Sequence, residues 1–153
     1  MNAGLVVAVD ARSGDHGAEV AVPAALDVLA STPDLRLTIV GRGELVRPLL
    51  GAALESGRCS FVEATEVVAM DERPQDALRR KKNSSMRVAI NLVEQGEASA
   101  CVSAGNTGAL LATARFVLGM VLLAATVYGV IKASGGEMTR IPALGDFIER
   151  VPF

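Results

Sequence analysis

The architecture of this chain follows from residues 5–17, which read LVVAVDARSGDHG. A short, valine-rich apolar run ends at Asp10, and a loop with two glycines follows it. Apolar runs of this length are typical of strands that are buried on both faces of a parallel sheet. Residues 19–30 then place apolar side chains at helical spacing, with Pro23 in the expected first turn, where proline is tolerated. The unit is therefore a strand, a polar loop and a helix.

The same unit recurs along the chain. Further strands are predicted at 35–40, 59–62 and 100–103, and further helices at 44–54, 75–81, 86–94 and from residue 108 onwards. Strands that alternate with helices indicate an α/β fold with a mostly parallel sheet. Ligands of such sheets bind beyond the carboxyl ends of the strands, where the loops 10–17 and 103–108 are expected.

Composition excludes several classes of protein. The chain has 153 residues, is 50% hydrophobic and carries a formal net charge of −2, which suits one domain and argues against a nucleic-acid-binding protein. Cys59 and Cys101 are far apart and His16 is the single histidine, so the set of about four ligands of a structural zinc site is missing. We expect no metal and no cofactor, two cysteines that fill the core, and a cytoplasmic location.

The loop 103–108 reads SAGNTG and lies between a predicted strand and a predicted helix. Backbone N–H groups at a helix start can bind an anion, and glycine lets the anion approach closely. The loop matches neither the P-loop nor the GxGxxG pattern. Two interpretations stay open, a phosphate site or an ordinary turn capped by a threonine. The candidate phosphate ligands are Ser103, Gly105, Asn106, Thr107 and Gly108.

A basic run precedes a pair of serines at residues 79–86, which read RRKKNSSM. One interpretation is a second phosphate-binding helix start, formed by Lys82, Ser84 and Ser85. Another is a solvated basic face that ends in a capping serine. A third is a docking patch for an acidic partner, because opposite charge steers association. That patch would consist of Arg79, Arg80, Lys81 and Lys82.

The first loop carries the remaining candidate ligands, which are Asp10, Gly14, Asp15 and His16. A carboxylate beside an imidazole can perform general acid–base chemistry. A single histidine in a loop is more often an ordinary surface residue. No catalytic base or nucleophile is assigned.

Three segments together resemble the phosphate acyltransferase family of the PlsX type. They are VVAMDERP at 67–74, ALRRKKNSSMRVA at 77–89 and VSAGNTGA at 102–109, and the start of the chain also agrees. The resemblance covers about residues 5–117. It implies the N-terminal part of a three-layer α/β/α domain akin to isopropylmalate dehydrogenases and phosphotransacetylases, truncated here and followed by a divergent hydrophobic segment and tail at 118–153.

The resemblance also implies a function. Members transfer a fatty acyl group from acyl carrier protein to inorganic phosphate, and a membrane acyltransferase uses the acyl phosphate in phospholipid synthesis. Members are homodimers that associate peripherally with the membrane. We expect the 153-residue form itself to be inactive. The alternative is a non-catalytic fragment that binds phosphate or the carrier protein and is tethered to a membrane.

Two regions depart from the family pattern. Arg12 and Ser13 stand where members usually have methionine and glycine, which introduces a charge beside the expected site. Residues 116–131 carry no charge and would span about 24 Å as a helix, short of a hydrocarbon core of about 30 Å. Three alternatives are open for this segment: a membrane span, a helix that covers the sheet, or an exposed helix.

Overall fold

The computed structural model describes residues 5–134, with side chains up to Tyr128. The chain up to Arg115 forms one compact unit, and the chain from Phe116 onwards forms a second. The strands are β1 (Leu5–Asp10), β2 (Leu35–Gly41), β3 (Cys59–Glu63) and β4 (Ala100–Ser103). The helices are α1 (Ala18–Ser31), α2 (Gly43–Leu50), α3 (Pro74–Arg80), α4 (Ser85–Glu94) and α5 (Thr107–Ser134), with a 3₁₀ helix at Gly51–Ser56.

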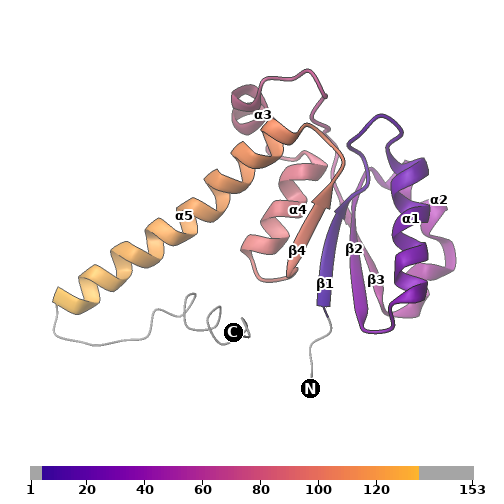
Figure 1. The fold of residues 1–153 in the computed structure, drawn as a ribbon, viewed down its shortest axis with the longest axis horizontal. Coiled ribbons are helices and arrows are strands. Elements are labelled where there is room, and N and C mark those ends of the chain that lie inside the picture. Colours follow the sequence, from indigo (N-terminus) through magenta and orange to yellow (C-terminus); the bar gives the residue numbers. More distant parts are fainter. Residues whose placement is uncertain (1–4, 135–153) are drawn as a thin grey trace. The chain divides into compact units, whose positions relative to one another are not determined.

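The four strands form one parallel sheet in the order β3-β2-β1-β4 (Figure 1). In this register Asp10, the last residue of β1, lies beside Val40 of β2 and Ser103 of β4. The carboxyl ends of β1 and β4 therefore meet at the same edge, as expected from the loops that follow them. The predicted α/β class and parallel sheet are confirmed.

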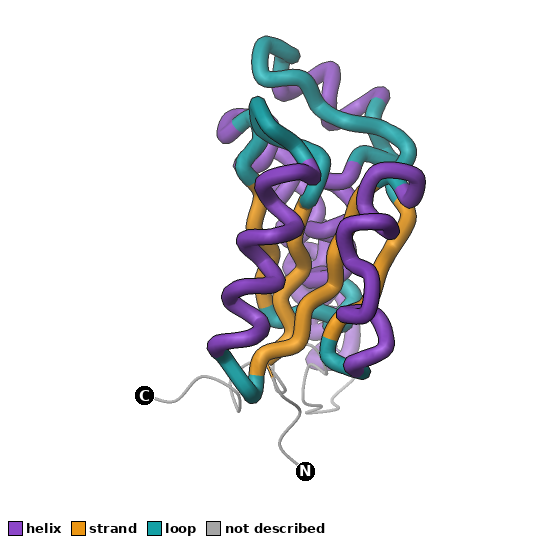
Figure 2. The backbone as a smooth tube through the Cα atoms, turned by 90° about the vertical axis from the view of Figure 1, so that its right-hand side faces the viewer, coloured by secondary structure: helices purple, strands orange, loops and turns teal. Residues whose placement is uncertain are grey.

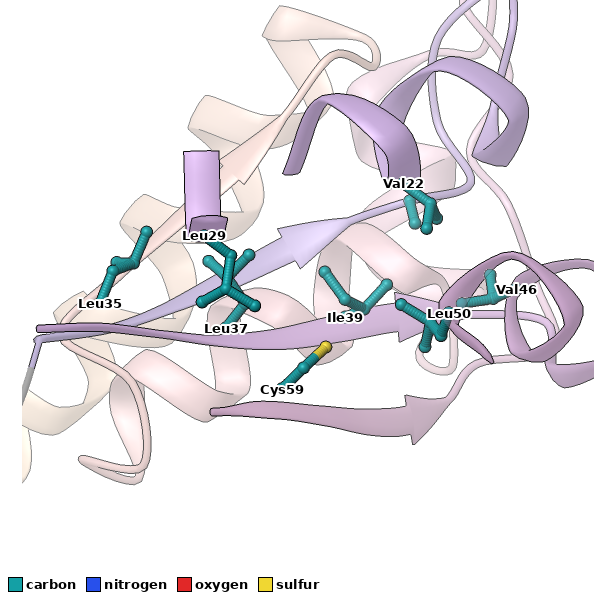
Figure 3. Packing of buried hydrophobic residues seen from close by; sticks show 9 residues of the cluster. Val22, Leu29, Leu35, Leu37, Ile39, Val46, Leu50 and Cys59 are labelled. Atoms are coloured by element: carbon teal, nitrogen blue, oxygen red, sulfur yellow. The ribbon is translucent and has the colours of Figure 1, made fainter. Parts of the chain in front are cut away.

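Helices cover both faces of the sheet, which accounts for the continuous apolar strands. On one face α1 and α2 lie over the strands (Figure 2), and Ile39 is fully buried beneath them. Figure 3 shows Val22 and Leu29 from α1 and Leu50 from α2 in this cluster. On the other face α4 packs on β1 and β2, where its Ala89 belongs to the second buried cluster. The result is the predicted three-layer arrangement.

Two helix predictions are wrong in detail. The chain enters α1 at Ala18, directly after Gly17, and Pro23 lies inside the helix rather than in its first turn. Gly51 has a φ of 45°, which ends α2 at Leu50, so a 3₁₀ helix over Gly51–Ser56 takes the place of the end of the single helix predicted at 44–54. A residue with a positive φ cannot continue the α-helical backbone, and glycine adopts such a conformation without steric cost.

The apolar segment of the second unit is helical, as part of α5. Its apolar side chains include Leu118, Met120, Leu122 and Val127, all of which are exposed. Within Thr107–Tyr128, an 18-residue window has a mean hydropathy of 2.1, and the stretch is long and apolar enough to cross a membrane, by length and composition. The three alternatives for residues 116–131 stay predictions. The rest of the predicted tail, 135–153, lies outside the described residues.

Candidate functional site

The buried carboxylate of Asp10 joins the ends of β1 and β4. Asp10 is 2% exposed, and its Oδ2 accepts a hydrogen bond of 2.7 Å from the Ser103 hydroxyl. Its Oδ1 accepts from the backbone N–H groups of Arg12 and Ser13, at 3.1 and 3.2 Å. The Ser103 hydroxyl in turn accepts from the N–H of Gly105. Asp10 therefore holds both loops in place, and its carboxylate is occupied by groups of the chain itself.

Glycines let these two loops approach each other closely. Gly14 has a φ of 92°, and a Cβ there would lie 3.2 Å from the Ala104 Cβ. A Cβ on Gly105 would lie only 2.6 Å from the Ser13 Cβ and 2.9 Å from the Met86 Cε. Met86 belongs to the first turn of α4, so the two loops and the start of α4 meet at Gly105. The sequence placed Gly14 and Gly105 in two separate candidate sites, and the structure brings them together.

Asn106 caps α5 and binds a third loop. Its Oδ1 accepts from the N–H of Ala109, and its Nδ2 donates to the carbonyls of Ala69, Met70 and Glu72 at 3.3, 3.0 and 2.8 Å. The residue that caps the helix is thus Asn106, whereas the ordinary-turn interpretation had placed a threonine there. The side-chain amide is hydrogen-bonded within the chain and positions the loop, and Asn106 as a phosphate ligand stays a prediction.

The serine pair at the start of α4 divides into a cap and an unpaired hydroxyl. The Ser84 hydroxyl accepts from the N–H of Arg87 and donates to the carbonyl of Lys81, so Ser84 is the N-cap. The Ser85 side chain is fully buried, and its hydroxyl has no hydrogen-bond partner among the described residues. Of the two serines, Ser84 is therefore the capping residue.

Two further polar side chains of the first loop are buried without partners. They are the Ser13 hydroxyl, in a residue that is 2% exposed, and the Nε and Nη1 atoms of the Arg12 guanidinium. Neither residue was predicted as a ligand, although both were noted as departures from the family pattern. Hydroxyl and guanidinium groups donate hydrogen bonds, so their chemistry suits an anion.

Several predicted ligands lie in exposed positions instead. Asp15, His16, Lys82, Thr107 and Gly108 are all exposed. In the part of the chain that the structure describes, no hydrogen bond joins Asp15 to His16, and each stays a predicted ligand without a visible chemical partner. The anion site at the sheet edge stays a prediction, and no general base is identified among the described residues.

Lys81 binds its own chain rather than facing solvent like its neighbours. Its Nζ donates to the Val67 carbonyl at 2.7 Å and forms an ion pair with Glu72 at 2.6 Å. The hydrogen bond from Lys81 lowers the pKa of Glu72, assisted by the N–H of Ala69 and opposed by burial. Together with Asn106, this pair fixes the loop that precedes α3.

The cysteines take no part in the site. Both are free, and burial raises the pKa of the Cys59 and Cys101 thiols, with the charge of Asp10 adding to the effect at Cys101. Cys59 belongs to the buried cluster under α1 and α2, as predicted. Within the described residues, no group of three or more potential ligands is placed to hold a metal ion.

The fold defines a class: a parallel α/β domain in which two loops and a helix start meet at the carboxyl ends of neighbouring strands. The chain belongs to the family described as "fatty acid synthesis protein", whose model matches residues 5–124. That match continues past residue 117, where the resemblance was expected to end. The family predicted from the sequence is confirmed.

Curated relatives agree with this assignment. The chain is 57% identical over 120 residues to the phosphate acyltransferase of Alkalilimnicola ehrlichii, covering 77% of this chain and 35% of that protein. It is 56% identical over 118 residues to that of Coxiella burnetii, with 73% and 34% covered. With the Halorhodospira halophila protein it shares 48% over 147 residues, 95% of this chain and 40% of the relative. The chain thus spans about a third of the length of these relatives.

The close approach at Gly105 generates the first prediction. Gly105→Ala places a methyl group against Ser13 and Met86, and we expect the free energy of unfolding to fall by about 1–3 kcal/mol, as in other overpacked sites. Chemical denaturation measures the change. The matched control is Gly119→Ala in α5, where a Cβ meets nothing within 4 Å and alanine improves helix propensity by up to about 1 kcal/mol. Equal effects of the two substitutions would contradict the packing described here.

The Lys81–Glu72 pair generates a pH-dependent prediction. Because the pKa of Glu72 is lowered in the folded state, its contribution to stability is present above the ordinary glutamate pKa of about 4.3 and is lost as the pH falls. Glu72→Gln is therefore expected to destabilise the protein at pH 7 and to approach wild-type stability in acid. Thermal unfolding between pH 7 and pH 3 measures the difference. Glu55→Gln, at an exposed position, controls for the loss of one carboxylate.

Proposed function

We propose that this chain supplies the phosphate-binding edge of an enzyme that transfers a fatty acyl group from acyl carrier protein to inorganic phosphate. The observation that carries the proposal lies inside the family-matched segment. There the ends of β1 and β4 and the start of α4 meet around buried hydroxyl and guanidinium groups that have no partner in the described chain. Relatives that are similar over this segment are named phosphate acyltransferases.

The chemistry is an acyl transfer from sulfur to oxygen. A phosphate oxygen attacks the thioester carbonyl carbon, the new C–O bond forms, and the C–S bond breaks to release the carrier protein as a thiolate that then takes up a proton. The product is an acyl phosphate. Phosphate is anionic at neutral pH and attacks without a base, so positioning and stabilisation of the carbonyl oxygen are the tasks left to the protein.

An exposed basic surface next to this edge supports docking of the carrier protein. Arg79 and Arg80 in the last turn of α3 and Lys82 just after it are exposed, whereas Lys81 is bound to Glu72. We propose that the docking surface consists of Arg79, Arg80 and Lys82, with Lys81 fixing the loop behind it. An acidic carrier protein would be steered to these charges.

Membrane association is a second proposal, and it rests on α5. Its apolar side chains are exposed, and its length and composition allow it to enter a bilayer. The substrate chemistry is consistent with such a location, because an acyl phosphate carries a long apolar chain to the next, membrane-bound enzyme. The apolar face would then anchor the site near the lipid surface.

A chimera tests acyl transfer directly. Residues 5–124 of this chain replace the matching segment of the Alkalilimnicola ehrlichii phosphate acyltransferase, to which the chain is 57% identical. We expect acyl phosphate formation, trapped as the hydroxamate, to stay within about tenfold of the parent enzyme, because the site residues are supplied in their own fold. A folded chimera without acyl transfer would refute the proposed function.

Charge reversal tests docking. Arg80→Glu combined with Lys82→Glu is expected to slow association of acyl carrier protein at low salt by about tenfold or more and to flatten its salt dependence. Stopped-flow binding measures both quantities. The control is Arg42→Glu, which changes an exposed arginine at the start of α2 that is paired with Glu44. An unchanged association rate in the double variant would show that the basic run is only a solvated surface.

A further inference from the structure

Three side chains at the sheet edge present hydrogen-bond donors that the chain leaves unused. They are the Nε and Nη1 atoms of Arg12 and the hydroxyls of Ser13 and Ser85, all buried and without a partner among residues 5–128. Ser13 is 2% exposed and Ser85 fully buried, so solvent does not substitute for the missing partners. Buried polar groups are nearly always paired, and each exception requires an explanation.

These donors belong to one place in the fold. Arg12 and Ser13 are consecutive on the loop that Asp10 holds, and the Ser13 hydroxyl lies 3.0 Å from the position of a Cβ on Gly105. The same position lies 2.9 Å from the Cε of Met86, the residue after Ser85 in the first turn of α4. The donors therefore belong to the first loop and to the helix start that meet at Gly105.

The charge of Arg12 is not compensated inside the chain. The Asp10 carboxylate accepts from backbone N–H groups and from Ser103, and it forms no ion pair with the Arg12 guanidinium within the described residues. Arginine cannot escape burial by losing its proton. Arg12 is half-buried, but two of its guanidinium nitrogens are buried without a partner, which is unfavourable, so an anion that binds to them gains both a charge partner and hydrogen-bond donors.

We propose that Arg12 is a specificity-determining residue of this edge, where its guanidinium, with the hydroxyls of Ser13 and Ser85, binds oxygen atoms of inorganic phosphate. A guanidinium presents donors in a planar fork that matches two oxygens of a phosphate. This inference names a residue that binds the phosphate of the proposed function. It rests on the proposed function only in treating that phosphate as the acceptor of the acyl group. Phosphate binding itself can be measured without any acyl substrate.

The test is thermal unfolding of the full 153-residue chain in a non-ionic detergent. Inorganic phosphate is titrated at constant ionic strength against chloride. We expect phosphate to raise the Tm of the wild type, because a ligand of the folded state stabilises it. Arg12→Met is expected to weaken phosphate binding by about tenfold or more, the loss of a charge-assisted hydrogen bond. Without phosphate, Arg12→Met should be at least as stable as the wild type, since it removes two buried nitrogens that have no hydrogen-bond partner among the described residues.

Three further variants sharpen the result. Arg12→Lys keeps the charge but loses the fork, and we expect an intermediate affinity for phosphate. Ser85→Ala should also weaken binding, because it removes one of the hydroxyl donors. Arg42→Met removes an exposed arginine at the start of α2, outside the proposed sites, and should keep the full phosphate response. If Arg12→Met does not fold, Arg12→Lys and Ser85→Ala decide the same question.

Two results would overturn the inference. The first is that Arg12→Met binds phosphate with an affinity within twofold of the wild type. The same conclusion would follow if both Arg12→Lys and Ser85→Ala did so. The other is an Arg12→Met variant that is destabilised equally with and without phosphate, which would assign Arg12 a structural role. In an active chimera, Arg12→Met should raise the KM for phosphate more than it lowers kcat. An inactive chimera combined with Arg12-dependent phosphate binding would refute the proposed function and leave this inference standing.

Discussion

The hydrogen bond between Asp10 and Ser103 is the constraint on which the functional edge depends. It joins residues 93 positions apart in the sequence, at the ends of two neighbouring parallel strands. The same carboxylate also holds the backbone of the loop that follows β1. A buried carboxylate is tolerated here because each of its oxygens accepts at least one hydrogen bond. Without it, neither loop would have a defined position relative to the other.

The close approach of the two loops has a further consequence for chemistry. Because Gly105 has no side chain, Ser13 and Met86 pack closely against its backbone. The buried Ser13 hydroxyl of the first loop therefore lies near the start of α4. Unpaired donors reduce the stability of an empty site. They are also the groups that the proposed anion would bind.

The basic run shows how one sequence feature divides into separate roles. The sequence predicts one patch of four consecutive cationic side chains. In the structure, Lys81 binds the Val67 carbonyl and Glu72, while the neighbouring cations are exposed. Asn106 is predicted as a ligand, and in the structure it joins the cap of α5 to the loop at 69–72. In both cases the partner lies in a loop whose path no local pattern predicts.

Local patterns in the sequence were sufficient for the strands, the parallel sheet and the loops that carry the site, because apolar runs and their polar ends report burial directly. They also placed Ser103 and Gly105 at the correct edge. The end of α2 before Gly51 depended on a backbone angle that a pattern does not encode. Only the tertiary structure shows that Asp10 accepts hydrogen bonds from both loops, that Asn106 caps α5, and that two nitrogens of the half-buried Arg12 have no partner among the described residues. Each of these roles arises from strand register and loop packing, which bring together groups that are far apart in the chain.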